Sequence, residues 1–348
     1  MSAPVSVINA LPAKQKLTVS FKLLLSLYAI IPLCLFIQLI DTFFLENYLK
    51  DNLPSSPTHF LLFQILFGTP HILASAIVLV GSAEYLKIYK RNILGITLLL
   101  AVIFGFGSLF IPYKVFYVFV AAWTVYHVIK QQLGVARGVC RLPNGAFYLL
   151  LSLSIVAGLF IYIGIFLKNS LEVQQVEALK LFVGLLCTCL VFTAVYCQRL
   201  IITKIGHWFL WANVLLIVSS FYLYVQQYYF LAILVPRLVH DATAYVFYVT
   251  HDFNKHHEQP QNLLYRCAAQ LRINIFLVLP LSSFALAFVL QAYGDQFVNF
   301  LAQFLFDVQI HKVITVGLLG YFALMHYYTE AITWKVGSPY RKYIGFSD

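Results

Sequence analysis

The sequence predicts an all-α integral membrane protein, a polytopic bundle of about ten transmembrane helices. Of its 348 residues, 61% are hydrophobic and only 10% are charged. A soluble core of this chain length could not bury so much apolar surface, and a surface that faces water needs more charges. The bilayer is therefore the solvent that this composition suits.

Ten stretches of the chain are long and apolar enough, or nearly so, to cross a bilayer core about 30 Å thick, which requires roughly 20 residues per helix. In chain order they are residues 20–40, 59–81, 92–113, 114–133, 145–168, 177–197, 207–230, 231–251, 271–293 and 311–333. The first is too long for the apolar region of a typical signal peptide. Two boundaries, at Pro112–Lys114 and Gln226–Tyr228, are also compatible with a bent or re-entrant element.

The distribution of charge predicts the orientation. Positive residues collect in alternate connections, which marks the cytoplasmic side. With both termini cytoplasmic, these connections and the C-terminal tail carry Lys87, Lys90, Arg91, Arg137, Arg141, Arg199, Lys204, Lys255, Arg266, Arg272, Lys335, Arg341 and Lys342. The opposite side carries Asp41, Glu46, Asp51, Glu172, Asp295 and Asp307. We expect one transmembrane domain over residues 1–348, with tails at 1–19 and 334–348, in a bacterial inner membrane or an equivalent intracellular membrane.

Four histidines lie inside predicted spans, where an ionisable side chain costs on the order of 3 kcal/mol and normally faces a partner in the bundle. They are His71, His127, His240 and His326, on the second, fourth, eighth and tenth stretches. On the predicted topology these four stretches run in the same direction. At 1.5 Å per residue the histidines lie roughly 18, 20, 14 and 22 Å below the outer edge. One shared layer is therefore possible, although helix rotation decides whether the side chains meet.

The spacing of polar partners favours a metal site. Gln131 follows His127, and Glu330 follows His326, each by one helical turn. Asp241 adjoins His240 and is one turn from Arg237. We expect the four histidines to bind the metal, with Glu330 and Asp241 as catalytic groups or ligands and Gln131 and Arg237 as supporting residues.

Two purely structural roles for these residues are alternatives to a metal site. Intramembrane histidines often only join helices by hydrogen bonds. Arg237 and Asp241 are also spaced as a purely structural ion pair.

A second group of polar residues, HDFNKHH, spans residues 251–257 at the predicted cytoplasmic end of the eighth stretch. His251, His256 and His257 are candidates for a second ligand set, for outer-shell groups or for the start of a proton path. His251 lies almost three turns from His240, on the same helix stripe. The same residues are also compatible with a solvated basic loop, since positive residues belong on this side.

One short motif resembles a known family. The element GTPH at residues 68–71, followed by further intramembrane histidines, resembles the bacterial β-carotene 15,15′-dioxygenase family of polytopic membrane enzymes. HDFNKHH more loosely resembles the histidine boxes of membrane desaturases and hydroxylases, although the HxxHH spacing is absent. Either resemblance implies a metal-dependent oxygenase that acts on a lipid or isoprenoid. Only His71 is carried over by motif.

We therefore expect a membrane-embedded oxidative enzyme that uses non-haem iron and a hydrophobic small-molecule substrate, with an electron donor as a further partner. Haem or another transition metal are alternative cofactors. A proton- or metal-coupled transporter is the alternative function, because Pro70 and Pro236 interrupt the hydrogen-bond ladder beside two of the histidines. The net charge of +10 is dispersed between apolar runs, which does not favour nucleic acid as a partner.

Overall fold

The computed structural model describes residues 16–54, 68–103, 110, 112–309, 319–335 and 337–347. Within these residues the chain is helical apart from two short strands, which agrees with the predicted all-α class. The longer helices are α2 (Ile30–Phe44), α5 (Thr69–Val80), α6 (Ala83–Ala101), α7 (Tyr113–Cys140), α8 (Asn144–Phe166), α9 (Val173–Cys197), α10 (Lys204–Val225), α11 (Tyr229–His256), α13 (Ile275–Phe306) and α14 (Leu319–Thr333). The shorter elements are β1 (Thr18–Ser20), α1 (Phe21–Ser26), α3 (Tyr48–Asn52), α12 (Leu263–Gln270), β2 (Gly345–Ser347) and the 3₁₀ helices η1 (Leu27–Ala29), η6 (Gln198–Leu200) and η8 (Tyr340–Tyr343).

Six helical runs among the described residues are long and apolar enough to cross a membrane. They are Phe21–Phe44, Asn144–Phe166, Val173–Leu200, Lys204–Val225, Tyr229–His256 and Ile275–Phe306. Helices α5 and α6 meet the same criteria only together, and they are bent by 109° at the break between them. The chain is thus a helical protein that suits a membrane, with six such runs, or seven if the bent pair is one span.

Local sequence signals set where helices begin and end. Ser82 caps α6, so this helix starts well before the predicted boundary at Asn92. Pro112 directly precedes α7. A proline at this position costs no helical hydrogen bond, because the first N–H groups of a helix have no partner within it, and its ring keeps the helix from starting earlier. Gln227 adopts a positive φ of 67° between α10 and α11 and reverses the chain there. Both boundaries that the sequence left open therefore separate distinct helices.

Two element predictions need correction. The predicted ninth stretch ends at Tyr293, but α13 continues to Phe306 because apolar residues keep recurring along it. Helix α12, whose N-terminus is capped by Asn262, lies in what was expected to be a loop. The beginnings of the second and tenth predicted stretches and the end of the third fall outside the described residues.

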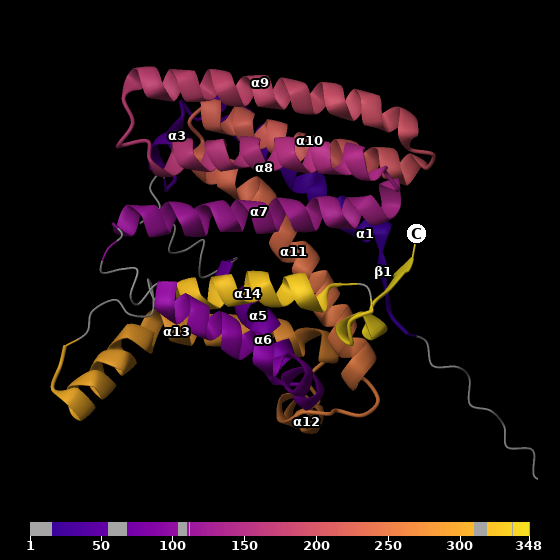
Figure 1. Cartoon of the computed structure of the whole chain (residues 1–348), viewed down its shortest axis with the longest axis vertical. Helices are drawn as coiled ribbons and strands as arrows, with labels where there is room; N and C mark the ends of the chain where they lie inside the picture. The colour runs from indigo at the N-terminus through magenta and orange to yellow at the C-terminus, as the bar shows by residue number, and fades with distance from the viewer. Residues whose placement is uncertain are drawn as a thin grey trace, which may run out of the picture.

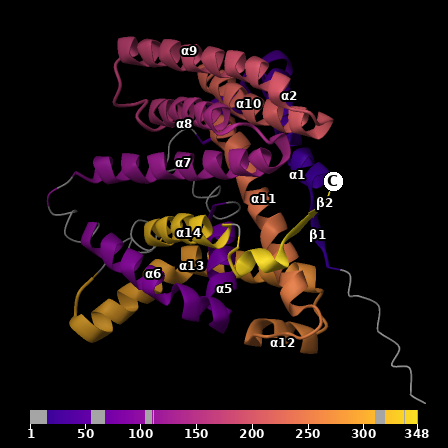
Figure 2. The ribbon, with the colours of Figure 1, turned by 45° about the vertical axis from the view of Figure 1, so that its right-hand side comes forward.

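Helix α11 lies at the centre of the bundle. It contacts α10, α7 and α2 on one side and α5 and α13 on the other. In Figures 1 and 2 it runs obliquely from the layer of α8, α9 and α10 to the group of α5, α6, α13 and α14. Its most apolar window is 67% buried inside the protein, against 22% for α9 and α13, whose exposed leucines and phenylalanines suit lipid.

The two ends of the chain meet in a parallel two-stranded sheet. Thr18 pairs with Gly345 and Ser20 with Ser347. The rings of Phe21 and Phe346 stack beside this sheet with centroids 5.0 Å apart. The sequence analysis assigned both segments to tails or their margins and did not predict that they pair.

Asp41 joins three elements at the end of the bundle where α2 stops. Its carboxylate accepts hydrogen bonds from the backbone N–H groups of Leu49 (2.7 Å) and Lys50 (3.0 Å) and from the Tyr228 hydroxyl (2.8 Å). Tyr228 directly precedes α11. This buried carboxylate therefore fixes the start of the central helix against α2 and α3.

We expect Asp41→Ala to lower the melting temperature of the detergent-purified protein by roughly 5 °C or more, because three donors lose a charged acceptor. Asp51→Ala is the matched control, since Asp51 is exposed on α3. Differential scanning fluorimetry measures both. Equal melting temperatures for the two variants would contradict the role assigned to Asp41.

Candidate metal centre

Four helices bring the four predicted histidines into one buried cluster. His71 lies in the first turn of α5, His127 in α7, His240 in α11 and His326 in α14. The ring centroids are 4.6 Å apart for His71 and His326, 5.0 Å for His127 and His240, 5.1 Å for His71 and His240, and 5.2 Å for His127 and His326. Each contact is edge to face, and no ring is more than 8% exposed.

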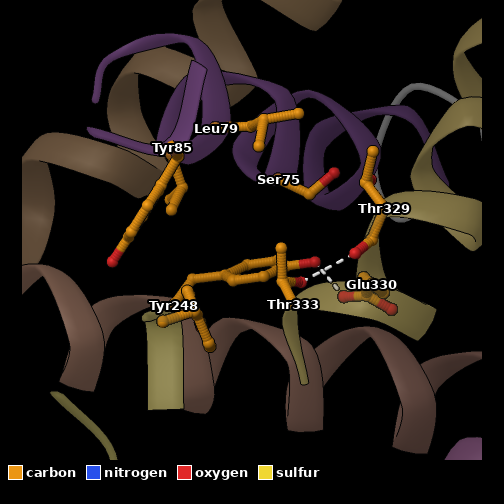
Figure 3. A pocket seen from close by; sticks show the side chains of 9 residues that line it. Ser75, Leu79, Tyr85, Tyr248, Thr329, Glu330 and Thr333 are labelled. Carbon is orange, nitrogen blue, oxygen red and sulfur yellow. Dashed lines mark hydrogen bonds between the residues drawn. The ribbon is translucent and has the colours of Figure 1, made fainter. Parts of the chain in front are cut away.

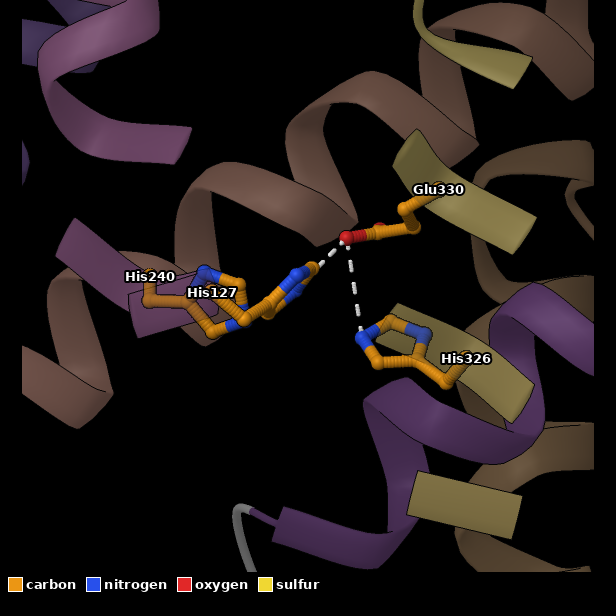
Figure 4. Close-up of side chains that lie close together, drawn as sticks. All are labelled: His127, His240, His326 and Glu330. Carbon is orange, nitrogen blue, oxygen red and sulfur yellow. Dashed lines mark ion pairs between the residues drawn. The ribbon is translucent and has the colours of Figure 1, made fainter. Parts of the chain in front are cut away.

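Two acidic side chains complete the cluster. Potential ligand atoms of His127, His240, His326 and Glu330 all lie within 4.8 Å of one another (Figure 4). Glu330 Oε2 is 3.0 Å from His127 Nε2 and 3.6 Å from His326 Nε2. A second group with the same spacing contains His71, His240 and Asp241. The two groups share His240, so they form one continuous set of nitrogen and oxygen donors.

The hydrogen bonds of Ser75 orient the ring of His326. The Ser75 hydroxyl donates to the Ile72 carbonyl oxygen (2.8 Å) and lies 2.7 Å from His326 Nδ1. This contact turns His326 Nε2 into the cluster, towards His71. When the Ser75 proton goes to Ile72, His326 carries its own proton on Nδ1, and Nε2 is available as a metal ligand.

Asp241 contacts His71 on the side away from His326. Its Oδ1 atom lies 3.1 Å from His71 Nδ1. A carboxylate behind the outer nitrogen of a ligand histidine is a common arrangement in metal sites.

The Nε2 atoms of His71 and His326 lie 3.0 Å apart. In the absence of a metal ion, one proton shared between the rings accounts for this distance. Two nitrogens that each lie about 2.1 Å from one metal ion, at a right angle, would also be about 3.0 Å apart. The two nitrogens are therefore spaced so that they could become adjacent ligands of one ion.

The ring nitrogens of His240 are an independent indication of a metal site. Both of its ring nitrogens are buried, and neither has a hydrogen-bond partner among the described residues. Buried polar atoms are almost always bonded, so an imidazole with two unsatisfied nitrogens requires an explanation. A metal ion would satisfy one of them.

The charges of the cluster fit one divalent ion better than two. The Arg237 guanidinium lies 3.3 Å from Asp241, and this ion pair is buried in α11. With the imidazoles neutral, Glu330 provides the one remaining negative charge. A single divalent ion leaves an excess of one positive charge, whereas two ions would leave three in a site from which water is excluded. Arg237 thus contacts Asp241 as predicted, and the pair is both structural and part of the cluster.

Glu330 is held in place from both sides. Gln131 Nε2 donates to Oε2 (2.7 Å), and the Tyr248 hydroxyl donates to Oε1 in a short hydrogen bond. The predicted supporting role of Gln131 therefore corresponds to an observed contact.

The structure separates the histidines of residues 251–257 from the metal cluster. His251 lies roughly 16 Å along α11 from His240, where it contacts Tyr85 and Asp252. The alternative of a solvated loop is wrong for most of this segment, because α11 continues to His256 and buries Asp252, Lys255 and His256. Only His257 of the three histidines is exposed, and it stacks on Phe253.

Sequence reasoning missed three residues that contact the cluster, namely Ser75, Tyr248 and Tyr327. Ser75 is one helical turn from His71, and Tyr248 is almost two turns from Asp241, so the spacing of α-helices could have identified both. Tyr327 stacks on His127 at a centroid distance of 4.4 Å, and no spacing rule indicates that contact across helices.

No family model matches this sequence, and comparisons with curated proteins and with solved structures also find no match. The resemblance of GTPH to the β-carotene dioxygenases thus stays a prediction. The assignment of the centre depends on its geometry.

We expect Ser75→Ala to weaken metal binding by about 10- to 100-fold, because outer-shell partners that orient a ligand typically contribute that much. Ser154→Ala provides the control, since Ser154 is equally buried but lies on α8. Competition titration of the purified protein with a chromophoric chelator and Fe²⁺ gives both affinities. Equal affinities would show that Ser75 does not orient a ligand.

Proposed function

We propose that this protein is a membrane-embedded, iron-dependent oxygenase that acts on a hydrophobic substrate such as a lipid or isoprenoid. The observation that carries the proposal is the buried group of His127, His240, His326 and Glu330, whose potential ligand atoms all lie within 4.8 Å of one another. His71 adds a further nitrogen 3.0 Å from His326 Nε2.

The donor set favours non-haem iron. Imidazole and carboxylate ligands suit Fe²⁺, and neither candidate metal group among the described residues contains a cysteine. Iron held here would supply the redox chemistry of dioxygen. The close edge-to-face packing of the four rings leaves little room for the macrocycle of a haem.

The site's position favours a substrate from the bilayer. The cluster lies at the centre of an apolar bundle and is almost fully buried, and a site with such surroundings suits a hydrophobic substrate. Glu330 has a fixed orientation through Gln131 and Tyr248, so it can accept or return a proton at Oε2 beside the metal ligands. The ion pair of Arg237 and Asp241 lies beside His71 Nδ1 and orients the His71 ring. Electrons for the reaction would come from a separate donor.

A transporter is less well supported. Transporters commonly break helices at a midplane ion site. Here α11 remains a continuous helix through Pro236 up to and beyond His240. Pro70 lies in the first turn of α5, where no hydrogen bond is lost.

We further propose ten transmembrane segments with both termini in the cytoplasm. The parallel pairing of β1 with β2 supports an even number of crossings, because it keeps the two tails on one side. Helix α7 is not among the six runs that suit a membrane by length and composition, which agrees with its contribution of His127 and Gln131 to a polar site.

Elemental mass spectrometry of detergent-purified protein tests the metal. We expect about one equivalent of iron in the wild type, a number that follows from the charges of the cluster. The variants His71→Ala, His127→Ala, His240→Ala and His326→Ala should each lose most of it. His207→Ala is the control, because His207 binds the Gln198 carbonyl oxygen far along the chain from the cluster. Wild-type protein without a bound transition metal would contradict the proposal.

Labelling of native cysteines tests the topology. Cys267 is exposed on α12, in a connection that we assign to the cytoplasm. A membrane-impermeant maleimide should label it in inverted membrane vesicles and not in sealed cells, and Cys267→Ser should abolish the signal. Cys189 is exposed on α9 but faces lipid in our assignment, so it should stay unlabelled from both sides. Labelling of Cys267 only from outside would reverse the orientation.

A further inference from the structure

A second buried polar cluster lies beyond the metal centre along α11. It consists of Tyr85 from α6, His251 and Asp252 from α11, and Tyr265 from α12, and we call it the relay cluster. Tyr85 OH lies 2.7 Å from His251 Nε2, and His251 Nδ1 lies 2.7 Å from Asp252 Oδ1. The Tyr265 hydroxyl donates to Asp252 Oδ2 in a short hydrogen bond. All four side chains are at most 3% exposed.

The donor and the acceptor of each hydrogen bond in the relay cluster can be assigned in order. Asp252 accepts from both neighbours, so His251 carries its proton on Nδ1 and accepts from Tyr85 at Nε2. Burial and the adjacent Asp252 carboxylate raise the pKa of Tyr265, which keeps this phenol protonated as a donor. A carboxylate that orients a histidine towards a hydroxyl is a geometry that enzymes use for proton transfer.

A small cavity of about 20 Å³, large enough for about one water molecule, lies between the relay cluster and the metal centre (Figure 3). Its lining contains six hydroxyl side chains and the Glu330 carboxylate, besides two apolar residues. The lining residues are Ser75, Val78, Leu79, Tyr85, Tyr248, Thr329, Glu330, Thr333 and Tyr340. Tyr85 thus belongs to both the relay cluster and the cavity wall.

The cavity reaches the metal centre at two points. Ser75 bonds to His326, and Glu330 lies beside His127. The buried Tyr340 hydroxyl lines the same cavity and has no hydrogen-bond partner among the described residues. A buried hydroxyl without a partner, beside a space of this size, is a place where an ordered water can bind.

We propose that the relay cluster and this hydroxyl-lined cavity form the path by which protons reach the metal centre from the α12 end of α11. This inference rests on the proposed function, since reduction of dioxygen at a buried centre consumes protons. The polarity described above is the one left after an inward transfer. Before the transfer, Asp252 is protonated and His251 carries its proton on Nε2. Asp252 then gives its proton to Nδ1, Nε2 gives one to the Tyr85 oxygen, and Tyr85 gives its own to water in the cavity, which passes one on to the metal centre. Asp252 regains a proton from the α12 side and His251 returns to the Nε2 tautomer, so the net result is one proton moved.

The charges around His251 suit this role. Lys255 donates to the Ser82 hydroxyl (2.7 Å), and its ammonium lies 3.8 Å from the Tyr85 ring centroid. The buried Lys255 ammonium offsets the negative charge of Asp252. From η8, the Tyr340 ring stacks on His251 at 4.3 Å, and the Tyr343 ring meets it edge to face at 5.2 Å. Glu84 at the start of α6 is exposed and adds a negative charge on the outer side of the cluster.

The α12 end of the proposed path lies close to the protein surface. His256 stacks on Tyr265 at 4.2 Å and accepts a hydrogen bond from the Gln261 backbone. The residues between them in sequence, from His257 to Gln259, are exposed. Asp252 and Tyr265 therefore lie about one helical turn below the surface of the α11–α12 connection.

Stopped-flow mixing of the Fe²⁺-loaded protein with oxygenated, weakly buffered solution tests the path. A pH-indicator dye reports proton uptake, and absorbance reports iron oxidation. We expect Tyr85→Phe and His251→Ala to bind as much iron as wild type and to take up protons about 10- to 100-fold more slowly. Added imidazole should restore much of the rate in His251→Ala alone. Tyr89→Phe is the control, because Tyr89 is a buried tyrosine one turn further along α6 with a ring centroid 6.5 Å from that of Tyr85.

Three results would overturn the proposal, and they are distinguishable. Wild-type rates of proton uptake in both variants, with iron bound, would remove the path and leave the metal centre intact. Loss of iron from Tyr85→Phe would show that the relay cluster only supports the metal site. Absence of iron from the wild type would contradict the oxygenase function, and the proton path would be rejected with it.

Discussion

The rest of this structure depends on the buried contact among four histidines and Glu330, in which the Nε2 atoms of His71 and His326 lie 3.0 Å apart. His71 is placed there by α5, which turns sharply into α6 at an angle of 109°. His326 is placed there by α14, and Ser75 holds the orientation of its ring. Polar side chains inside an apolar bundle cost free energy unless each is paired. These helices therefore converge where their polar side chains can satisfy one another, and the proposed metal ion would join them further.

The central position of α11 follows from the same requirement. This helix carries His240 and the ion pair between Arg237 and Asp241 near its middle, and the polar residues His251, Asp252, Lys255 and His256 near its end. Charged and polar side chains in a membrane must be surrounded by protein rather than by lipid. Helices α10, α7 and α2 on one side and α5 and α13 on the other provide that cover. Helix α9 lacks such residues in its middle and lies at the edge of the bundle.

Much of this organisation was predictable from the sequence, for definite physical reasons. Apolar length identified the helices, and the cost of ionisable groups in lipid singled out His71, His127, His240 and His326 before any geometry was known. Equal depth in the membrane was the one positional argument available, and the four rings do meet. Helix rotation was not predictable, because α8 and α9 are apolar all round and neighbouring contacts alone determine which face turns inward.

Contacts between distant segments marked the limit of sequence reasoning. The stacking of Tyr327 on His127 and the bond from Tyr248 to Glu330 join residues whose relation appears only when the helices are assembled. The interpretation of residues 251–257 as a loop failed for a different reason. Their charge resembles that of a cytoplasmic connection, but the charges are satisfied within the protein by Tyr85, Tyr265 and Ser82, so the helix can continue.

The pairing of β1 with β2 has a consequence for the order of assembly. The first described strand cannot find its partner until residues 345–347 have been synthesised, and α14, which supplies His326 and Glu330, is itself the last long helix of the chain. During synthesis the growing protein therefore contains His71, His127 and His240 without the two groups that complete the donor set. The proposed metal ion would bind firmly only to the finished chain, so its uptake would be the last step of folding. A chain truncated before α14 would lack His326 and Glu330.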